Sequence, residues 1–211
     1  MIATLIVLAK RPEPGKVKTR LVGATSAWGA AVVAAAALTD TLDSVDATPV
    51  RSRVLAFDGD VSTWLRPGWR TIAQPSGGLD HRLWSSFMDA GPGPAALIGM
   101  DTPQVTPVEL AAFDLDRFDA CLGPSTDGGY WMIGFREAQT ARAAIERVPM
   151  STGNTYDAQL TRLRDLGLRV QILSEQTDVD TPESADVVAN IAPHTRFAEQ
   201  WRAQTEHALA V

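Results

Sequence analysis

The sequence is poor in the residues on which disulfide and zinc chemistry depend. Its 211 residues include one cysteine, Cys121, so no intramolecular disulfide can form and a reducing cytoplasm is expected. No histidine is paired with Cys121 nearby, which indicates a small core residue rather than a nucleophile. The three histidines, His81, His194 and His207, are scattered and do not have the spacing of a zinc site.

Familiar nucleotide-binding and hydrolase motifs are also absent. The segment from Gly15 to Thr19 lacks the earlier glycine that a Walker A loop requires. No G-x-G-x-x-G follows the first apolar run, and there is no G-x-S-x-G. P-loop, nicotinamide-binding Rossmann and α/β-hydrolase assignments therefore have no support in this sequence.

Long apolar runs and an excess of positive charge are missing as well. No apolar stretch could span a bilayer, and the N-terminus has neither the basic region nor the long apolar region of a signal peptide. The formal net charge is −6 and the charges are scattered, which argues against nucleic acid as the main partner. We expect a cytoplasmic protein with no membrane and no nucleic-acid partner.

Apolar runs and amphipathic segments alternate along the chain, which favours an α/β fold. This pattern is typical of a three-layer αβα sandwich around a mostly parallel sheet. No linker divides the sequence, so a single domain over residues 1–211 is expected. The predicted strands are Ile2–Ala9, Arg53–Phe57, Arg70–Ala73, Ala95–Gly99, Phe118–Leu122, Tyr130–Phe135 and Leu168–Leu173. The predicted helices are Ser26–Leu42, Leu79–Ala90, one from about Pro107, Ala138–Val148, Asn154–Leu166, Pro182–Ala192 and Thr195–Leu209.

The segment after the first predicted strand is strongly basic. Five cationic residues fall within eleven positions, in a loop that Pro-x-Pro-Gly keeps from forming a helix or strand. Lysine and arginine neutralise phosphate, and loop amides add donors. We predict a polyphosphate-binding loop; the alternative is a solvated basic surface loop. The residues assigned to phosphate or nucleotide binding are Lys10, Arg11, Gly15, Lys16, Lys18, Thr19 and Arg20.

A second nucleotide contact is predicted at Gly78, which opens the helix that starts at Leu79. Free amides at a helix N-terminus can accept a base edge or a phosphate. An ordinary connection between a strand and a helix explains the same residues equally well.

Carboxylates follow several predicted strands, where an open α/β sheet binds its ligands. Asp101 leaves a strand without polar residues, and Thr102-Pro103 restricts its backbone. Asp180 opens Asp180-Thr181-Pro182-Glu183, where helix capping alone also explains the residue types. Mg²⁺ binds one or two carboxylates together with waters and phosphate oxygens. We predict Asp101 and Asp180 as metal ligands, with Asp178 as the alternative to Asp180 for direct ligation.

The segment Ser125–Trp131 combines polar side chains, two glycines and two aromatic residues. One interpretation is a substrate-facing turn in which Asp127, Gly128, Gly129 and Tyr130 bind the acceptor. The other is an Asp-Gly hairpin turn that leads into an edge strand.

Four elements in order resemble the DUF2064 family. They are Lys10-x-Pro-x-Pro-Gly-x-x-Lys-Thr-Arg-Leu, Gly99-x-Asp-x-Pro, Asp127-Gly-Gly-Tyr and Val179-Asp-Thr-Pro-Glu. That family is also described as transferase 1 of rSAM/selenodomain-associated clusters and belongs with the nucleotide-diphospho-sugar transferase (GT-A) superfamily. Within it, Asp101 and Asp180 resemble the two metal-binding carboxylates of sugar cytidylyltransferases. The Lys-Thr-Arg-Leu element is similar to that of phospholactate and phosphoenolpyruvate guanylyltransferases.

The resemblance implies an enzyme that uses Mg²⁺ or Mn²⁺ and either a nucleoside triphosphate or a nucleotide sugar, with a small-molecule acceptor. Glycosyltransferases of this fold usually carry Asp-x-Asp, whereas Gly99-Met100-Asp101 has one carboxylate, and the basic loop suits a triphosphate. Nucleotidyl transfer is therefore favoured, with Lys18, Asp101 and Asp127 as catalytic residues. Glycosyl transfer is the alternative, and a non-catalytic nucleotide-binding protein is the third. A homodimer is common in the superfamily, but no residue here indicates one.

Overall fold

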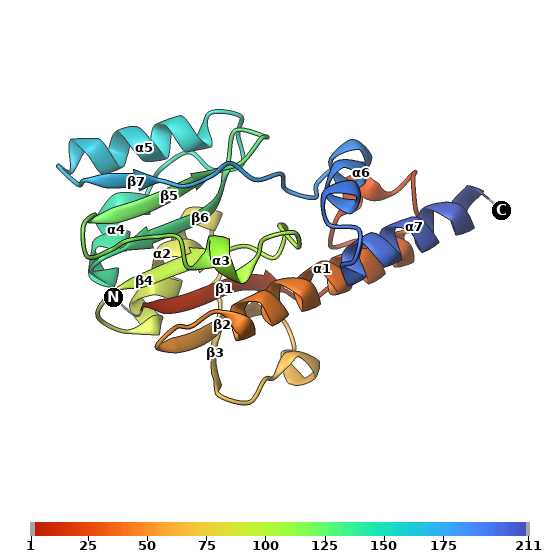
Figure 1. The fold of residues 1–211 in the computed structure, drawn as a ribbon, viewed down its shortest axis with the longest axis horizontal. Coiled ribbons are helices and arrows are strands. Elements are labelled where there is room, and N and C mark those ends of the chain that lie inside the picture. The colour runs from red at the N-terminus through yellow and green to blue at the C-terminus, as the bar shows by residue number, and fades with distance from the viewer. Residues whose placement is uncertain (1–2, 210–211) are drawn as a thin grey trace.

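A computed structural model describes residues 3–209. Within this range, seven strands form one sheet in the order β3-β2-β1-β4-β6-β5-β7 (Figure 1). The strands are β1 (Thr4–Lys10), β2 (Ser52–Asp58), β3 (Trp69–Ala73), β4 (Ala95–Ile98), β5 (Ala120–Pro124), β6 (Tyr130–Phe135) and β7 (Val170–Ile172). The predicted first strand included Ile2, which lies outside the described residues.

The sheet is mixed but mostly parallel, which confirms the predicted fold class. β1 pairs in parallel with β2 and β4, β2 with β3, and β5 with β7. β6 runs antiparallel to both β4 and β5. All strands except β6 therefore end at the same edge of the sheet, and the turn between β5 and β6 lies at that edge too.

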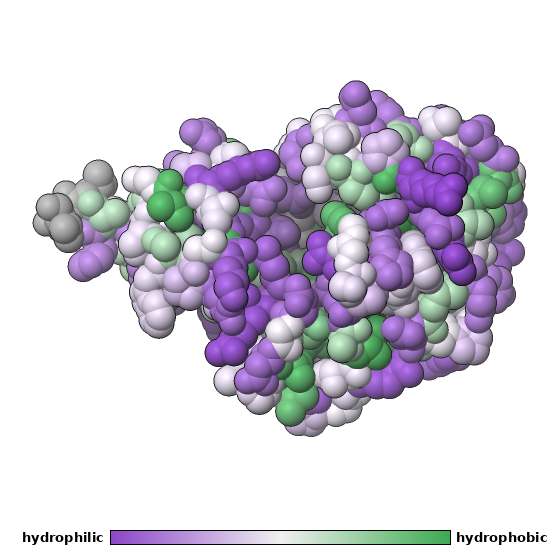
Figure 2. All heavy atoms as spheres, turned by 180° about the vertical axis from the view of Figure 1, so that it is seen from behind, coloured by the Kyte–Doolittle hydropathy of each residue, from purple (hydrophilic) through white to green (hydrophobic). Residues whose placement is uncertain are grey.

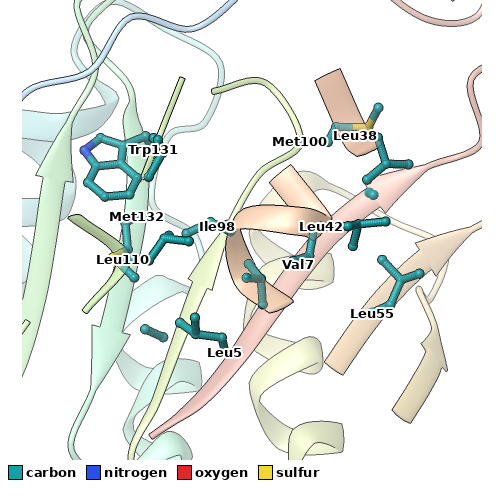
Figure 3. Packing of buried hydrophobic residues seen from close by; sticks show 14 of the residues in the cluster. Leu5, Val7, Leu38, Leu42, Leu55, Ile98, Met100, Leu110, Trp131 and Met132 are labelled. Carbon is teal, nitrogen blue, oxygen red and sulfur yellow. The ribbon is translucent and has the colours of Figure 1, made fainter. Parts of the chain in front are cut away.

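Helices cover both faces of the sheet, because apolar side chains point from each strand to either side. On one face, α1 (Ala27–Ala47) and the short α3 (Pro107–Leu110) bury residues against β1 and β4 (Figure 3). On the other face, α2 (Leu79–Ala90), α4 (Ala141–Ile145) and α5 (Thr155–Asp165) pack against the same sheet. The arrangement has the three layers that the alternating sequence predicts.

The last two helices contact α1 and lie beyond the sheet. α6 (Pro182–Ile191) and α7 (Arg196–Leu209) form a separate apolar cluster with Ala30, Val33 and Ala37 of α1 (Figure 1). α1 is rich in alanine, so it buries side chains on two sides and lets α7 approach closely along its length.

One predicted helix is much shorter in the structure. The segment predicted as Ala138–Val148 consists of a 3₁₀ turn, η3 (Ala138–Thr140), and α4, which ends at Ile145. Glu146 then adopts ψ 126° and Arg147 has a positive φ of 65°, so the helical path cannot continue. The helix expected from about Pro107 also exists but spans only four residues, with Thr106 and Glu109 forming a capping box at its start.

Two further expectations concern single features of the chain. Cys121 is fully buried in β5, and burial raises the pKa of its thiol to about 12, as expected of a core residue. Among residues 3–209, every helix is too short or too polar to traverse a lipid bilayer.

Asp119 fastens β7 to β5, and its contribution to stability should depend on pH. Its carboxylate accepts hydrogen bonds from the guanidinium and then from the backbone amide of Arg169, which lower its pKa from 3.8 to about 2. Because the folded pKa is depressed, this stabilisation is present above about pH 4 and is lost as the pH falls toward 2. We expect Asp119→Asn to lower the free energy of unfolding by about 1 kcal/mol at pH 7, measured by urea denaturation. An equal difference between variant and wild type at pH 2 would contradict this account.

Candidate active site

A cleft of about 610 Å³ lies at the edge of the sheet where the parallel strands end. Its lining comes from the basic loop after β1, the residues after β4, the β5–β6 turn, the start of α2 and segments 150–155 and 178–180. Figure 2, which views the face opposite to Figure 1, shows hydrophilic residues around a hollow between the body of the molecule and its projecting C-terminal end. The size suits a small-molecule ligand.

Lys18 joins the two predicted metal-binding carboxylates. Its ammonium contacts Asp101 Oδ1 and lies 3.0 Å from Asp180 Oδ1. The Lys18 side chain is only 7% exposed, whereas the side chains of Asp101 and Asp180 are 42% and 40% exposed toward solvent. Burial opposes the charge of Lys18, but the two carboxylates outweigh it and raise the pKa of the ammonium.

Local backbone features place these three residues. Asp101 follows β4 in the chain, and its carbonyl accepts a hydrogen bond of 2.8 Å from the Val179 amide, which brings segment 178–180 to the end of the sheet. Lys18 adopts a left-handed conformation with φ 47° just before the 3₁₀ turn η1 (Thr19–Leu21), which turns its side chain into the cleft. The side-chain cap of α6 is Thr181, which bonds the Ser184 amide, so capping alone does not account for Asp180.

Asp178 is a third carboxylate in the cleft and is partly buried. Desolvation, followed by the nearby charges of Asp101 and Asp127, raises its pKa to about 7. Lys18 acts in the opposite direction. Asp178 is thus distinguished from Asp180, whose side chain makes the direct ion pair with Lys18.

The seven residues of the basic loop that were predicted to bind phosphate divide into two groups. Lys10, Lys18, Thr19 and Arg20 line the cleft. Arg11 and Lys16 form ion pairs with Glu13 and, like Gly15, are absent from its lining. Lys10 also donates to the Lys16 carbonyl at 3.0 Å. The assignment of all seven residues to phosphate binding remains a prediction. Four of the seven line the cleft, as phosphate binding there requires.

The β5–β6 turn also contributes to the lining of the cleft. Asp127 and Gly129 line the cleft, and Asp127 Oδ1 accepts from the Gly129 amide at 2.8 Å. The turn is a hairpin turn, yet β6 lies inside the sheet between β4 and β5, so the edge strand of the alternative interpretation is wrong. Tyr130 also lines the cleft, while its hydroxyl points to Gln159 at 3.4 Å.

Gly128 holds this turn against the loop at residues 151–154. It has φ 87°, and a Cβ on it would lie 2.1 Å from the Gly153 carbonyl oxygen. The Tyr156 amide also donates to the Gly128 carbonyl at 2.9 Å. Both contacts join Gly128 to the neighbouring loop and to α5, and acceptor binding by Gly128 stays a prediction.

Two of the cleft residues that were not assigned a role from the sequence have a buried side-chain atom without a hydrogen-bond partner among residues 3–209. Gln74 donates to the carbonyls of Ala9 and Ala56, which leaves its buried Oε1 without a hydrogen-bond partner among the described residues. Arg82, in the first turns of α2, likewise has a buried Nε without a partner there. Their only sequence signal is the polar segment around Gly77 and Gly78. Gly78 itself is the N-cap residue of α2 and is not among the residues that line the cleft.

The carboxylate pair has the chemistry of a divalent-cation site. Residues 3–209 contain no group of three histidine, cysteine, aspartate or glutamate side chains that could hold a metal. Two aspartates are nevertheless enough for Mg²⁺ when water and phosphate oxygens complete the shell. Asp101 and Asp180 already converge on one positive charge, the Lys18 ammonium, so the pair fits a cation that binds together with a phosphate ligand.

Comparison with known proteins places the chain in a family. Residues 41–152 match the model of DUF2064, described as an uncharacterized protein conserved in bacteria, and the chain belongs to this family. The matched range includes Asp101 and Asp127 but neither the basic loop nor Asp180. No curated protein matches the sequence.

Solved structures share the fold over nearly the whole chain. A protein of Desulfovibrio desulfuricans G20, provisionally described as a nucleotide-diphospho-sugar transferase, is 26% identical with a TM-score of 0.85, covering 98% of each chain. Rv0371c of Mycobacterium tuberculosis H37Rv, in complex with manganese, is 19% identical with a TM-score of 0.57 over 90% of this chain and 99% of that one. CMP:2-keto-3-deoxy-manno-octonic acid synthetase, in complex with CTP, is 13% identical with a TM-score of 0.58 over 92% and 99%. The last two likenesses show the fold alone.

Proposed function

We propose that the protein is a divalent-metal-dependent transferase that uses a nucleotide substrate, and that it transfers a nucleotidyl group from a triphosphate. The observation that carries this proposal is the cleft itself, where cations of the basic loop meet two carboxylates at the carboxyl edge of the sheet. Polyphosphate and its metal require these two kinds of group side by side. The CMP:2-keto-3-deoxy-manno-octonic acid synthetase, which has a similar fold, was solved in complex with CTP, and this supports the substrate class.

The residues of the cleft have distinct roles in this reaction. Lys10, Lys18 and Arg20 bind the phosphates, and Asp101 and Asp180 hold Mg²⁺ or Mn²⁺, which neutralises charge on the phosphate oxygens when bound. An anionic acceptor can attack the α-phosphorus without a protein base, and pyrophosphate leaves. For a hydroxyl acceptor, Asp127 of the β5–β6 turn is the candidate base. In this proposal, the chain forms one transferase domain.

Glycosyl transfer from a nucleotide sugar is the second candidate. It is favoured by the Desulfovibrio protein, which is provisionally described as a nucleotide-diphospho-sugar transferase. Against it, the segment after β4 offers the single carboxylate of Asp101 instead of an Asp-x-Asp pair.

Thermal unfolding with a panel of ligands tests both candidates. A ligand that binds the folded state raises the midpoint Tm by mass action, by several degrees when it saturates the site. We expect one nucleoside triphosphate to raise Tm only when Mg²⁺ or Mn²⁺ is present, which also identifies the base. A shift confined to a nucleotide sugar and its diphosphate would replace nucleotidyl transfer by glycosyl transfer. No shift with any nucleotide would contradict both.

A further inference from the structure

Lys18 occupies the point at which the two candidate metal ligands meet. One ammonium satisfies Asp101 Oδ1 and Asp180 Oδ1 together, and Arg20 lies 3.8 Å from the second oxygen of Asp180. Two cations of the basic loop and two carboxylates from later parts of the sequence thus already balance one another in the protein alone. A divalent cation that needs the same oxygens has to displace an existing positive charge.

The burial of Lys18 makes this contact a defined feature of the fold. Its side chain is almost covered, and its neighbours Val17 and Leu21 are buried, so the ammonium cannot turn freely into solvent. The backbone at Lys18 has φ 47°, a conformation that costs free energy in a residue other than glycine. The ion pairs with Asp101 and Asp180 help to stabilise Lys18 in this left-handed backbone conformation.

The choice of lysine is itself informative. The sequence has sixteen arginines but only three lysines, at positions 10, 16 and 18, all in the basic loop. An ammonium is a compact charge on a flexible chain, whereas a guanidinium is a planar fork that fixes its partners. Lysine is the better residue where one charge must exchange partners.

We propose that Lys18 fills the divalent-cation position of the free protein and that the metal enters together with the substrate's phosphates. This inference rests on the proposed function. The incoming phosphates offer the Lys18 ammonium new anionic partners, which frees Asp101 and Asp180 for the metal. Metal and nucleotide therefore bind cooperatively, and the free protein binds the metal weakly.

Mn²⁺ binding to the protein without nucleotide tests the proposal directly. We expect Lys18→Met, which keeps most of the length of the side chain but removes its charge, to bind Mn²⁺ at least about tenfold more tightly than wild type, because a close repulsion is removed. Electron paramagnetic resonance of free Mn²⁺ measures this affinity without any catalytic assay. Lys18→Arg retains the charge and should show no such gain.

Two further variants locate the effect. Arg51→Met removes one positive charge from an exposed position at the opposite edge of the sheet and should leave Mn²⁺ affinity unchanged. Adding Asp101→Asn to Lys18→Met should abolish the gain, because the ion then lacks one carboxylate. Circular dichroism and Tm of each variant confirm that it is folded.

Two results overturn the proposal. One is equal Mn²⁺ affinity in folded Lys18→Met and wild type, and the other is a gain that survives the loss of the Asp101 charge. If Lys18→Met gains Mn²⁺ affinity while no nucleotide shifts Tm, Lys18 does fill the divalent-cation position but the transferase proposal fails. If a triphosphate and metal shift Tm together while Lys18→Met shows no gain, the transferase proposal stands and this one fails.

Discussion

An Asp101→Asn variant will lose metal-dependent nucleotide binding by about 100-fold or more while it remains folded. Asparagine has nearly the same volume, and the Asp101 side chain is 42% exposed, so packing changes little. The change removes one of two charges that hold the cation and leaves Lys18 with Asp180 alone. The measurement is the Tm shift produced by the active triphosphate with and without Mn²⁺.

Asp58→Asn is the matched control for this experiment. Asp58 ends β2 at the same edge of the sheet, next to Lys10 in the parallel register, but it is not among the residues lining the cleft. We expect its metal-dependent Tm shift to equal that of wild type. Equal shifts in Asp101→Asn and Asp58→Asn would show that Asp101 is not a ligand.

Phe87→Ala will give a large loss of stability, about 3–5 kcal/mol and roughly 10 °C in Tm. Phe87 is fully buried on α2, with its ring 5.2 Å from that of Phe135 in an edge-to-face contact. Alanine would leave a cavity between the later turns of α2 and the end of β6, away from the residues of α2 that line the cleft. Denaturant unfolding measures the change in free energy.

Trp28→Ala provides the comparison for an aromatic residue that does not pack. Trp28 is 68% exposed near the start of α1, so its removal should change stability by less than about 0.5 kcal/mol. If the two truncations cost the same, Phe87 would not belong to the core that the structure assigns to it.

Much of the fold could be predicted because its signals are local. Helix α2 spans Leu79–Ala90 as expected, since Gly78 and Gly91 delimit its amphipathic pattern on either side. The end of α4 could not be predicted, because Arg147 adopts a positive φ that no residue type there requires. The internal position of β6 depends on its pairing with two strands, which a hairpin signal alone does not reveal.

The sequence predicts several residues of the candidate site individually, but it does not predict the contacts that these residues make with one another. Asp101 and Asp180 stand out because each follows an element that ends at one edge of the sheet. The ion pairs of Glu13 with Arg11 and Lys16 were missed, although Glu13 lies three residues before Lys16. The insertion of Lys18 between the two carboxylates depends on its left-handed backbone and on long-range contacts, so no local pattern could have predicted it.

The ion pair between Lys18 and Asp180 joins residues 162 positions apart, and this has a consequence for how the protein is made. During synthesis, the basic loop and β1 leave the ribosome long before Asp180. Until then the loop has no second carboxylate, and α1 has neither α6 nor α7 to cover its alanine-rich side. The nascent chain can form most of its sheet but not its binding site. Contacts this distant in sequence also slow folding, so the cleft should form late, after most of the sheet.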